Sequence, residues 1–247
     1  MYQLGLVSIS FRSHCVKELL KACQSTGLTQ IEWGSDVHAP CRDTERLLEL
    51  AKLQKTYGIT CSSYGTYFRL GRDSVSELPE YIRAAKILGT NILRLWCGTK
   101  GSGQYTAEEL SAFYEECRAA ARIAEQEDVI LCMECHNDTL TDWKEPALKL
   151  MQEVNSLAFR MYWQPNQHRT VEENFAYAEL LAPYTEHIHV FNWEGDNRYP
   201  LGDAVSLWKE YLKRFDGDKS LLLEFMPDDN IETLPAEVNA LRQIAEM

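Results

Sequence analysis

The sequence has few basic residues for its acidic content. It carries 25 Lys and Arg against 37 Asp and Glu in 247 residues, a formal net charge of −12 at pH 7 with neutral His. Nucleic acids and anionic membrane surfaces attract positively charged protein surfaces. We therefore expect neither a nucleic acid nor a membrane as the main partner.

Long apolar runs and glycine-rich phosphate loops are also missing. No stretch reaches the roughly 20 apolar residues that a membrane-spanning helix needs. The patterns Gly-x-Gly-x-x-Gly and Gly-x-x-x-x-Gly-Lys-Ser/Thr, which bind nucleotide phosphates, do not occur. No secretory leader is evident, and eight cysteines in a chain of this length indicate reduced thiols rather than a disulfide scaffold. We expect a cytoplasmic protein.

A repeated unit fills the chain. Eight short runs rich in Ile, Val, Leu and aromatic residues begin near Leu4, Leu28, Gly58, Asn91, Val129, Phe159, His187 and Ser220. The stretches between them repeat apolar residues at helical spacing. Apolar strands that alternate with helices are typical of parallel sheets covered on both faces. The pattern predicts an α/β fold, a (βα)8 TIM barrel that forms one domain over residues 1–247. An open doubly wound sheet is the alternative, although residues 11–14 lack the glycines of its usual first turn.

Polar residues interrupt several apolar runs near their carboxyl ends. Glu134 and His136 share a face at the end of the fifth run, and Glu224 follows three leucines in the eighth. His189 lies in the seventh run, and Gln164 ends the sixth. Functional residues of a TIM barrel lie at the carboxyl ends of its strands, so we expect these side chains to share one site.

Buried carboxylates are costly unless they are paired or bound to a metal. Each residue alone would also fit a satisfied buried polar group or an ion pair. Together they favour a divalent metal site, for which Mn²⁺, Mg²⁺, Co²⁺ and Zn²⁺ suit the oxygen and imidazole ligands. Cys132 and Cys135 have a zinc-like spacing, but residues three apart on a strand point to opposite faces. We expect no zinc site at these cysteines.

Four short segments carry a resemblance to a known family: residues 31–33, 134–136, 187–190 and 223–224. In their order and strand placement the sequence resembles the xylose isomerase-like TIM barrels, in the branch of sugar phosphate isomerases and epimerases that includes ketose 3-epimerases. The resemblance implies one divalent metal ion held by Glu134, Gln164, His189 and Glu224. Gln164 stands where that family usually has Asp, so the site would carry one negative charge fewer.

The resemblance also implies an activity, that of an isomerase or epimerase acting on a sugar or sugar phosphate. Such an enzyme removes a proton next to a carbonyl through a metal-stabilised enediolate. Glu134 and Glu224 are then the paired acid and base, and His136 binds a substrate oxygen. Further substrate-binding candidates are the aromatic rings of Tyr64, Trp96 and Trp193, and the guanidinium of Arg198. A homodimer would not be unusual in this family.

Two other functions remain open. A nuclease resembling endonuclease IV would share the fold, but its histidines after the third and fourth strands are missing here, where residues 62–64 and 95–97 stand. A non-catalytic or metal-free sugar-binding barrel is the second, because Gln164 weakens the expected metal site.

Overall fold

The computed structural model describes residues 2–246 and confirms the predicted TIM barrel. Eight parallel strands close into a ring in the order β1-β10-β7-β6-β5-β4-β3-β2. They are β1 (Gln3–Val7), β2 (Gln30–Gly34), β3 (Thr60–Leu70), β4 (Ile92–Cys97), β5 (Ile130–Glu134), β6 (Phe159–Trp163), β7 (Thr185–Val190) and β10 (Ser220–Leu223). The closed order rules out the open doubly wound sheet.

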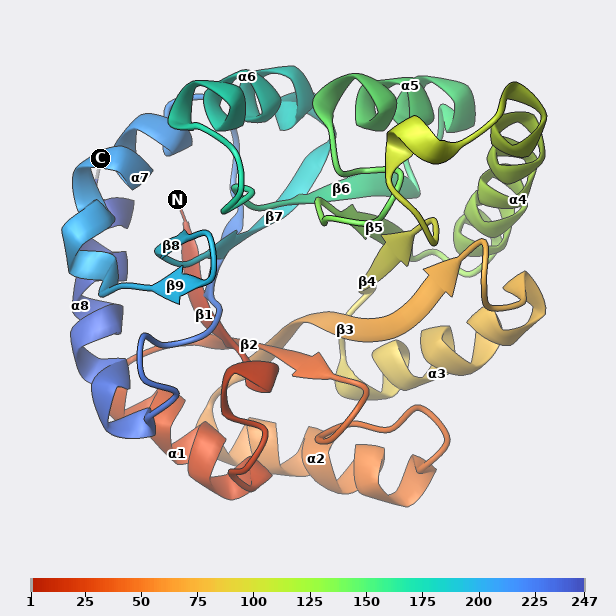
Figure 1. Ribbon diagram of the computed structural model, residues 1–247. Helices are drawn as coiled ribbons and strands as arrows, with labels where there is room; N and C mark the ends of the chain where they lie inside the picture. The colour runs from red at the N-terminus through yellow and green to blue at the C-terminus, as the bar shows by residue number, and fades with distance from the viewer. Residues whose placement is uncertain (1, 247) are drawn as a thin grey trace.

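Within the described residues, eight α-helices surround the ring (Figure 1). They are α1 (Val16–Thr26), α2 (Thr44–Tyr57), α3 (Leu78–Leu88), α4 (Ala107–Gln126), α5 (Lys144–Val154), α6 (Val171–Leu181), α7 (Val205–Leu212) and α8 (Leu234–Ala245). Local chemistry sets their ends. Thr106 and Glu109 cap the start of α4 by exchanging hydrogen bonds, and α2 ends at Gly58, whose φ of 68° suits a residue without Cβ.

Short 3-10 turns connect several strands and helices. They are η1 (Ser8–Phe11), η2 (Val75–Glu77), η3 (Ser102–Gln104), η4 (Ala182–Tyr184), η5 (Leu201–Ala204) and η6 (Ile231–Thr233). Because η1 follows β1 directly, it carries the chain across the carboxyl end of the barrel before α1 begins.

Strand register fixes the heights of the polar side chains at this end of the barrel. Glu134 is the last residue of β5, and it pairs with Tyr162 of β6. His189 of β7 pairs with Leu222 of β10. The amide of Glu224 donates to the carbonyl of Val190 over 3.0 Å, which continues this pairing beyond the end of β10. The three side chains therefore lie at the same end of neighbouring parts of the ring.

A small antiparallel hairpin follows β7. Its strands are β8 (Trp193–Glu194) and β9 (Asn197–Arg198), with Trp193 opposite Arg198. The amide of Gly195 in its turn donates to the carbonyl of Gln167 over 2.8 Å, so the hairpin is tied to the loop after β6. Two-residue strands leave no pattern in a sequence, and the alternation of strands and helices did not predict this hairpin.

The cysteines and the hydropathy of the helices bear on the sequence-based expectations about disulfides and membrane spans. Each of the eight cysteines is free, and six of them are buried. Among residues 2–246, no helix has both the length and the apolar character that crossing a bilayer requires.

Candidate functional site

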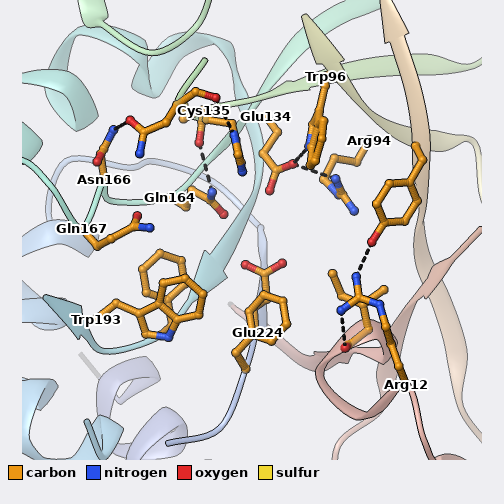
Figure 2. A pocket seen from close by; sticks show the side chains of 16 residues that line it. Arg12, Arg94, Trp96, Glu134, Cys135, Gln164, Asn166, Gln167, Trp193 and Glu224 are labelled. Carbon is orange, nitrogen blue, oxygen red and sulfur yellow. Dashed lines mark hydrogen bonds and ion pairs between the residues drawn. The ribbon is translucent and has the colours of Figure 1, made fainter. Parts of the chain in front are cut away.

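A pocket of about 320 Å³ lies at the carboxyl ends of the strands (Figure 2). Both polar and aromatic side chains line it. They include the carboxylates of Glu134 and Glu224, the amides of Asn137, Gln164, Asn166 and Gln167, and the rings of Tyr67, Trp96, His136, Phe191, Trp193 and Phe225. The volume suits a small metabolite.

A buried ion network lies beneath this pocket. Arg94 on β4 donates to Glu32 on β2 over 2.9 Å and to Glu134 on β5 over 2.7 Å. All three side chains are at most 4% exposed. Gly65 on β3 leaves room for the network, because a Cβ there would lie 2.5 Å from an Oε1 atom of Glu32. Arg94 thus neutralises carboxylates that would otherwise be costly to bury.

The network separates the pKa values of the two carboxylates in the pocket. Burial alone would raise the pKa of Glu134, but the charges of Arg94 and His189 hold it at about 2. Burial raises the pKa of Glu224; the charge of His189 opposes this rise and the charge of Glu134 adds to it. Two carboxyl groups with different proton affinities in one pocket are a common arrangement for acid–base chemistry.

His189 is held between these groups. Burial disfavours its charged ring, yet the carboxylates of Glu224 and Glu32 raise its pKa to about 10. Its Nε2 lies 3.4 Å from Oε2 of Glu32. A carboxylate behind a histidine fixes the ring and directs the other nitrogen outward, as in many metal sites.

Three oxygen atoms surround Nδ1 of His189 in the pocket. His189 Nδ1 lies 3.5 Å from Oε1 of Glu134, 3.5 Å from Oε2 of Glu224 and 3.0 Å from Oε1 of Gln164. Ligands about 2.1 Å from a shared ion lie about 3.0 to 3.4 Å apart in octahedral or tetrahedral geometry. The predicted ligands Glu134, Gln164, His189 and Glu224 are therefore brought together at spacings that fit one divalent ion.

Gln164 presents its oxygen to this cluster. Its Nε2 donates to the carbonyl of Cys135 over 3.0 Å, which leaves Oε1 facing His189. An amide oxygen is a neutral ligand for hard cations. Compared with the Asp that the resemblance implies at this position, Gln164 carries no charge but keeps a donor atom in place.

His136 and Trp96 pack together on one wall. Their rings stack with centroids 4.7 Å apart, and the indole Nε1 of Trp96 donates to Oε2 of Glu134. His136 Nδ1 lies 2.7 Å from the carbonyl of Asn137, so this nitrogen carries a proton. Both predicted residues line the pocket. Trp96 adds to Arg94 in stabilising the anionic form of Glu134.

Trp193 of the hairpin forms part of the rim, as expected, but Arg198 lies behind it. The guanidinium of Arg198 lies 4.8 Å from the ring centre of Trp193 and 4.7 Å from that of Phe225, and it pairs with Asp229. Arg198 is not among the residues that line the pocket. It holds the hairpin against the loop after β10 rather than reaching into the pocket.

Tyr64 does not reach the pocket, which corrects the expectation from the sequence. It is fully buried, and its hydroxyl donates to the carbonyl of Ala39 over 2.6 Å. Alternation along β3 turns its side chain towards the helix layer. Tyr67, three residues further on, lines the pocket instead.

Several lining residues were not predicted from the sequence. Arg12 follows η1, and Asn137, Asn166 and Gln167 lie in loops after β5 and β6. Loop residues have no periodicity that would reveal where they point. Their position just after a strand is the one signal that marks them as candidates.

Comparison with protein families gives one match over most of the chain. A family model described as the xylose isomerase-like TIM barrel matches residues 20–244. A 3-dehydroshikimate dehydratase from Bacillus anthracis is 24% identical over 273 residues, which cover 96% of this chain and 95% of that protein.

Solved structures share the fold at low identity. The crystal structure of the probable 3-DHS dehydratase from Bacillus anthracis has a TM-score of 0.81 at 18% identity and covers 98% of this chain and 99% of its own. An L-ribulose 3-epimerase has a TM-score of 0.74 at 14% identity, covering 98% and 93%. A xylose isomerase-like TIM barrel from Mycobacterium smegmatis in complex with magnesium has a TM-score of 0.73 at 13% identity, covering 99% and 97%.

Proposed function

Because this chain belongs to the xylose isomerase-like TIM-barrel family, we propose that it is an enzyme that removes a proton next to a carbonyl group of a small polyhydroxylated compound. The observation that carries the proposal is the convergence of Glu134, His189 and Glu224, whose donor atoms lie within 4.8 Å of one another. The pocket above them has the size of a small metabolite.

We propose that the four donors hold one divalent metal ion, of the set Mn²⁺, Mg²⁺, Co²⁺ and Zn²⁺. The fit rests on the spacing of the donors, on Oε1 of Glu134, which faces His189, and on the orientation of Gln164. When bound, such an ion stabilises the negative charge that develops on a substrate oxygen as the proton leaves.

Glu224 is the proposed base. Its carboxylate faces the pocket, and burial raises its pKa, which makes it a better proton acceptor than Glu134. The Oε2 atom of Glu134 is occupied by Arg94 and Trp96. Glu134 therefore remains an ionised ligand, while Glu224 accepts and releases the proton. His136 and the amides on the opposite wall are placed to bind hydroxyl groups of the substrate.

Because only Glu224 is assigned to proton transfer, the site favours dehydration as the overall reaction. Glu224 removes the proton next to the carbonyl, a carbon–carbon double bond forms, and the hydroxyl on the next carbon leaves. The leaving hydroxyl takes up the same proton from Glu224, so that water is released and no oxidant is needed. The curated relative that matches along nearly the whole chain is a dehydratase, which supports this choice.

Isomerisation or epimerisation is the second candidate, as the family resemblance implies. In an aldose–ketose isomerisation Glu224 returns the proton to the adjacent carbon. In an epimerisation a second acid must return it from the opposite face, and Glu134 would have to supply it. The hydrogen bonds of Arg94 and Trp96 to Glu134 disfavour that role, while the fold shared with an L-ribulose 3-epimerase keeps the reaction class open.

Exchange of substrate hydrogen with deuterated water tests the proposal for dehydration, isomerisation and epimerisation alike. The protein with Mn²⁺ is incubated in deuterated water with 3-dehydroshikimate or with D-ribulose, and products and label are followed by NMR. We expect label or product with one of them, and a loss of about 100-fold or more in Glu224→Gln.

The matched control is Glu186→Gln, which removes a carboxylate from the amino-terminal end of β7. Full activity of Glu224→Gln, or an equal loss in both variants, would contradict the role given to Glu224. A conjugated product indicates dehydration, whereas a new sugar indicates isomerisation or epimerisation.

A further inference from the structure

We propose that Arg12 and Tyr67 form an anion-binding subsite at one side of the pocket, and that the substrate carries a carboxylate or phosphate group there. This inference rests on the proposed function, because it names the class of substrate for the same pocket. Both residues line the pocket, and neither belongs to the cluster of metal-binding donors.

Arg12 has N–H donors that its present hydrogen bonds do not use. Its Nε donates to Oδ2 of Asp36 over 2.7 Å, its Nη1 to the carbonyl of Ile9 over 3.3 Å and its Nη2 to the hydroxyl of Tyr67. A guanidinium has five N–H groups, and these contacts use three of them. The remaining two lie on the terminal nitrogens, and the side chain is 42% exposed. Arg12 can therefore bind an oxyanion without breaking its present contacts.

Tyr67 adds a third donor beside them. Its hydroxyl oxygen accepts from Arg12, and among residues 2–246 this hydroxyl donates no hydrogen bond of its own. Burial raises the pKa of Tyr67, so the hydroxyl keeps that proton. Two N–H groups and one O–H group on adjoining side chains match the oxygens of a carboxylate or a phosphate.

The other cation of the pocket is not available for this role. Arg94 is 2% exposed and is neutralised by Glu32 and Glu134. Asp36 pairs with Nε of Arg12 and fixes the orientation of the guanidinium, and it leaves one N–H group on each terminal nitrogen for a ligand. Arg12 is thus the lining cation that a bound anion can reach.

The placement also orients a substrate. Figure 2 shows Arg12 on one side of Glu224, with Asn166 and Gln167 on the other side. An anionic group at Arg12 would leave the remaining carbons over Glu224 and Glu134, with hydroxyl groups towards the amides. A neutral polyol would lack the first of these anchors.

Three non-reacting probes with one carbon skeleton test the subsite: ribitol, ribonate and ribitol 5-phosphate. Their dissociation constants are measured by calorimetry with the Mn²⁺-loaded protein and again without Mn²⁺. We expect at least one anion to bind about tenfold or more tightly than ribitol. Preference for ribonate indicates a carboxylate, and preference for ribitol 5-phosphate indicates a phosphate.

Arg12→Gln should reduce the affinity of the preferred anion to that of ribitol while leaving the affinity for ribitol and for Mn²⁺ unchanged. Tyr67→Phe should remove part of the preference. The matched control is Arg42→Gln, which removes the same charge from an exposed arginine paired with Glu80. It should keep the full preference.

Equal affinities of all three probes for the wild type, no binding of any probe at millimolar concentration, or a preserved preference in Arg12→Gln would each overturn the subsite. Failure of the proposed function would appear elsewhere, as loss of Mn²⁺ binding or of hydrogen exchange. The anion preference is measured in either case, so the two failures are distinguishable.

Discussion

Replacing Arg94 with methionine tests whether the buried ion network stabilises this barrel. The substitution keeps an apolar stem of similar length and removes the charge that bridges Glu32 and Glu134. Each of the two lost contacts is a hydrogen bond between charged groups, worth about 1.5 to 3 kcal/mol. Breaking a buried pair from one side costs about 3 to 5 kcal/mol, because a buried charge loses its partner. We expect Arg94→Met to lower the free energy of unfolding by about 3 to 5 kcal/mol.

Urea unfolding followed by circular dichroism measures this loss, and thermal unfolding should show a fall of roughly 6 to 20 °C for a chain of this length. Arg94→Lys keeps the charge but loses the forked geometry, so its loss should be smaller. Arg42→Met is the control for removing an exposed arginine, and it should leave the midpoint unchanged. A loss below about 1 kcal/mol in Arg94→Met would refute the reasoning, because the network would then contribute little to folding.

Three further substitutions test separate parts of the account. Gln164→Asp restores a charged oxygen ligand and should tighten Mn²⁺ binding by roughly tenfold, measured by calorimetry; unchanged affinity would place this side chain outside the metal site. Gly65→Ala places a Cβ 2.5 Å from Glu32 and 2.9 Å from Arg94, and should lower the free energy of unfolding by about 1 to 3 kcal/mol; a neutral effect in urea unfolding would contradict the crowding. Arg198→Gln removes the cation that holds the β8–β9 hairpin, and should raise KM more than it lowers kcat; the opposite pattern would give Arg198 a role in the chemical step.

The fold was predictable from the sequence because one simple pattern repeats along it. Apolar strands and amphipathic helices alternate at nearly even spacing, and a closed ring of eight such units buries both faces of every strand. Glu134, His189 and Glu224 stood out for a related reason. A carboxylate or imidazole inside an apolar run has a high cost of burial, so its presence indicates a partner.

The remaining parts of the site depend on contacts between distant segments. The pairing of Arg94 with Glu32 spans 62 residues, and no local sequence pattern identifies which carboxylate Arg94 contacts. The direction of Tyr64 depends on a register shift between β2 and β3, where Ile31 pairs with Cys61 but Glu32 pairs with Ser63. A shift of one residue turns a side chain to the other face of a strand, which is why an aromatic near a strand end could not be assigned to the pocket. Arg12 lies in a loop, where no periodicity applies.

Anomalous X-ray scattering from a crystal grown with Mn²⁺ tests the central claim, that Glu134, Gln164, His189 and Glu224 hold one divalent ion in the pocket. Data collected on both sides of the manganese absorption edge locate the ion without reference to its ligands. We expect a single strong peak within bonding distance of Oε1 of Glu134, Oε1 of Gln164, Nδ1 of His189 and a carboxylate oxygen of Glu224. Manganese bound elsewhere on the protein, with no peak among these four side chains, would contradict it.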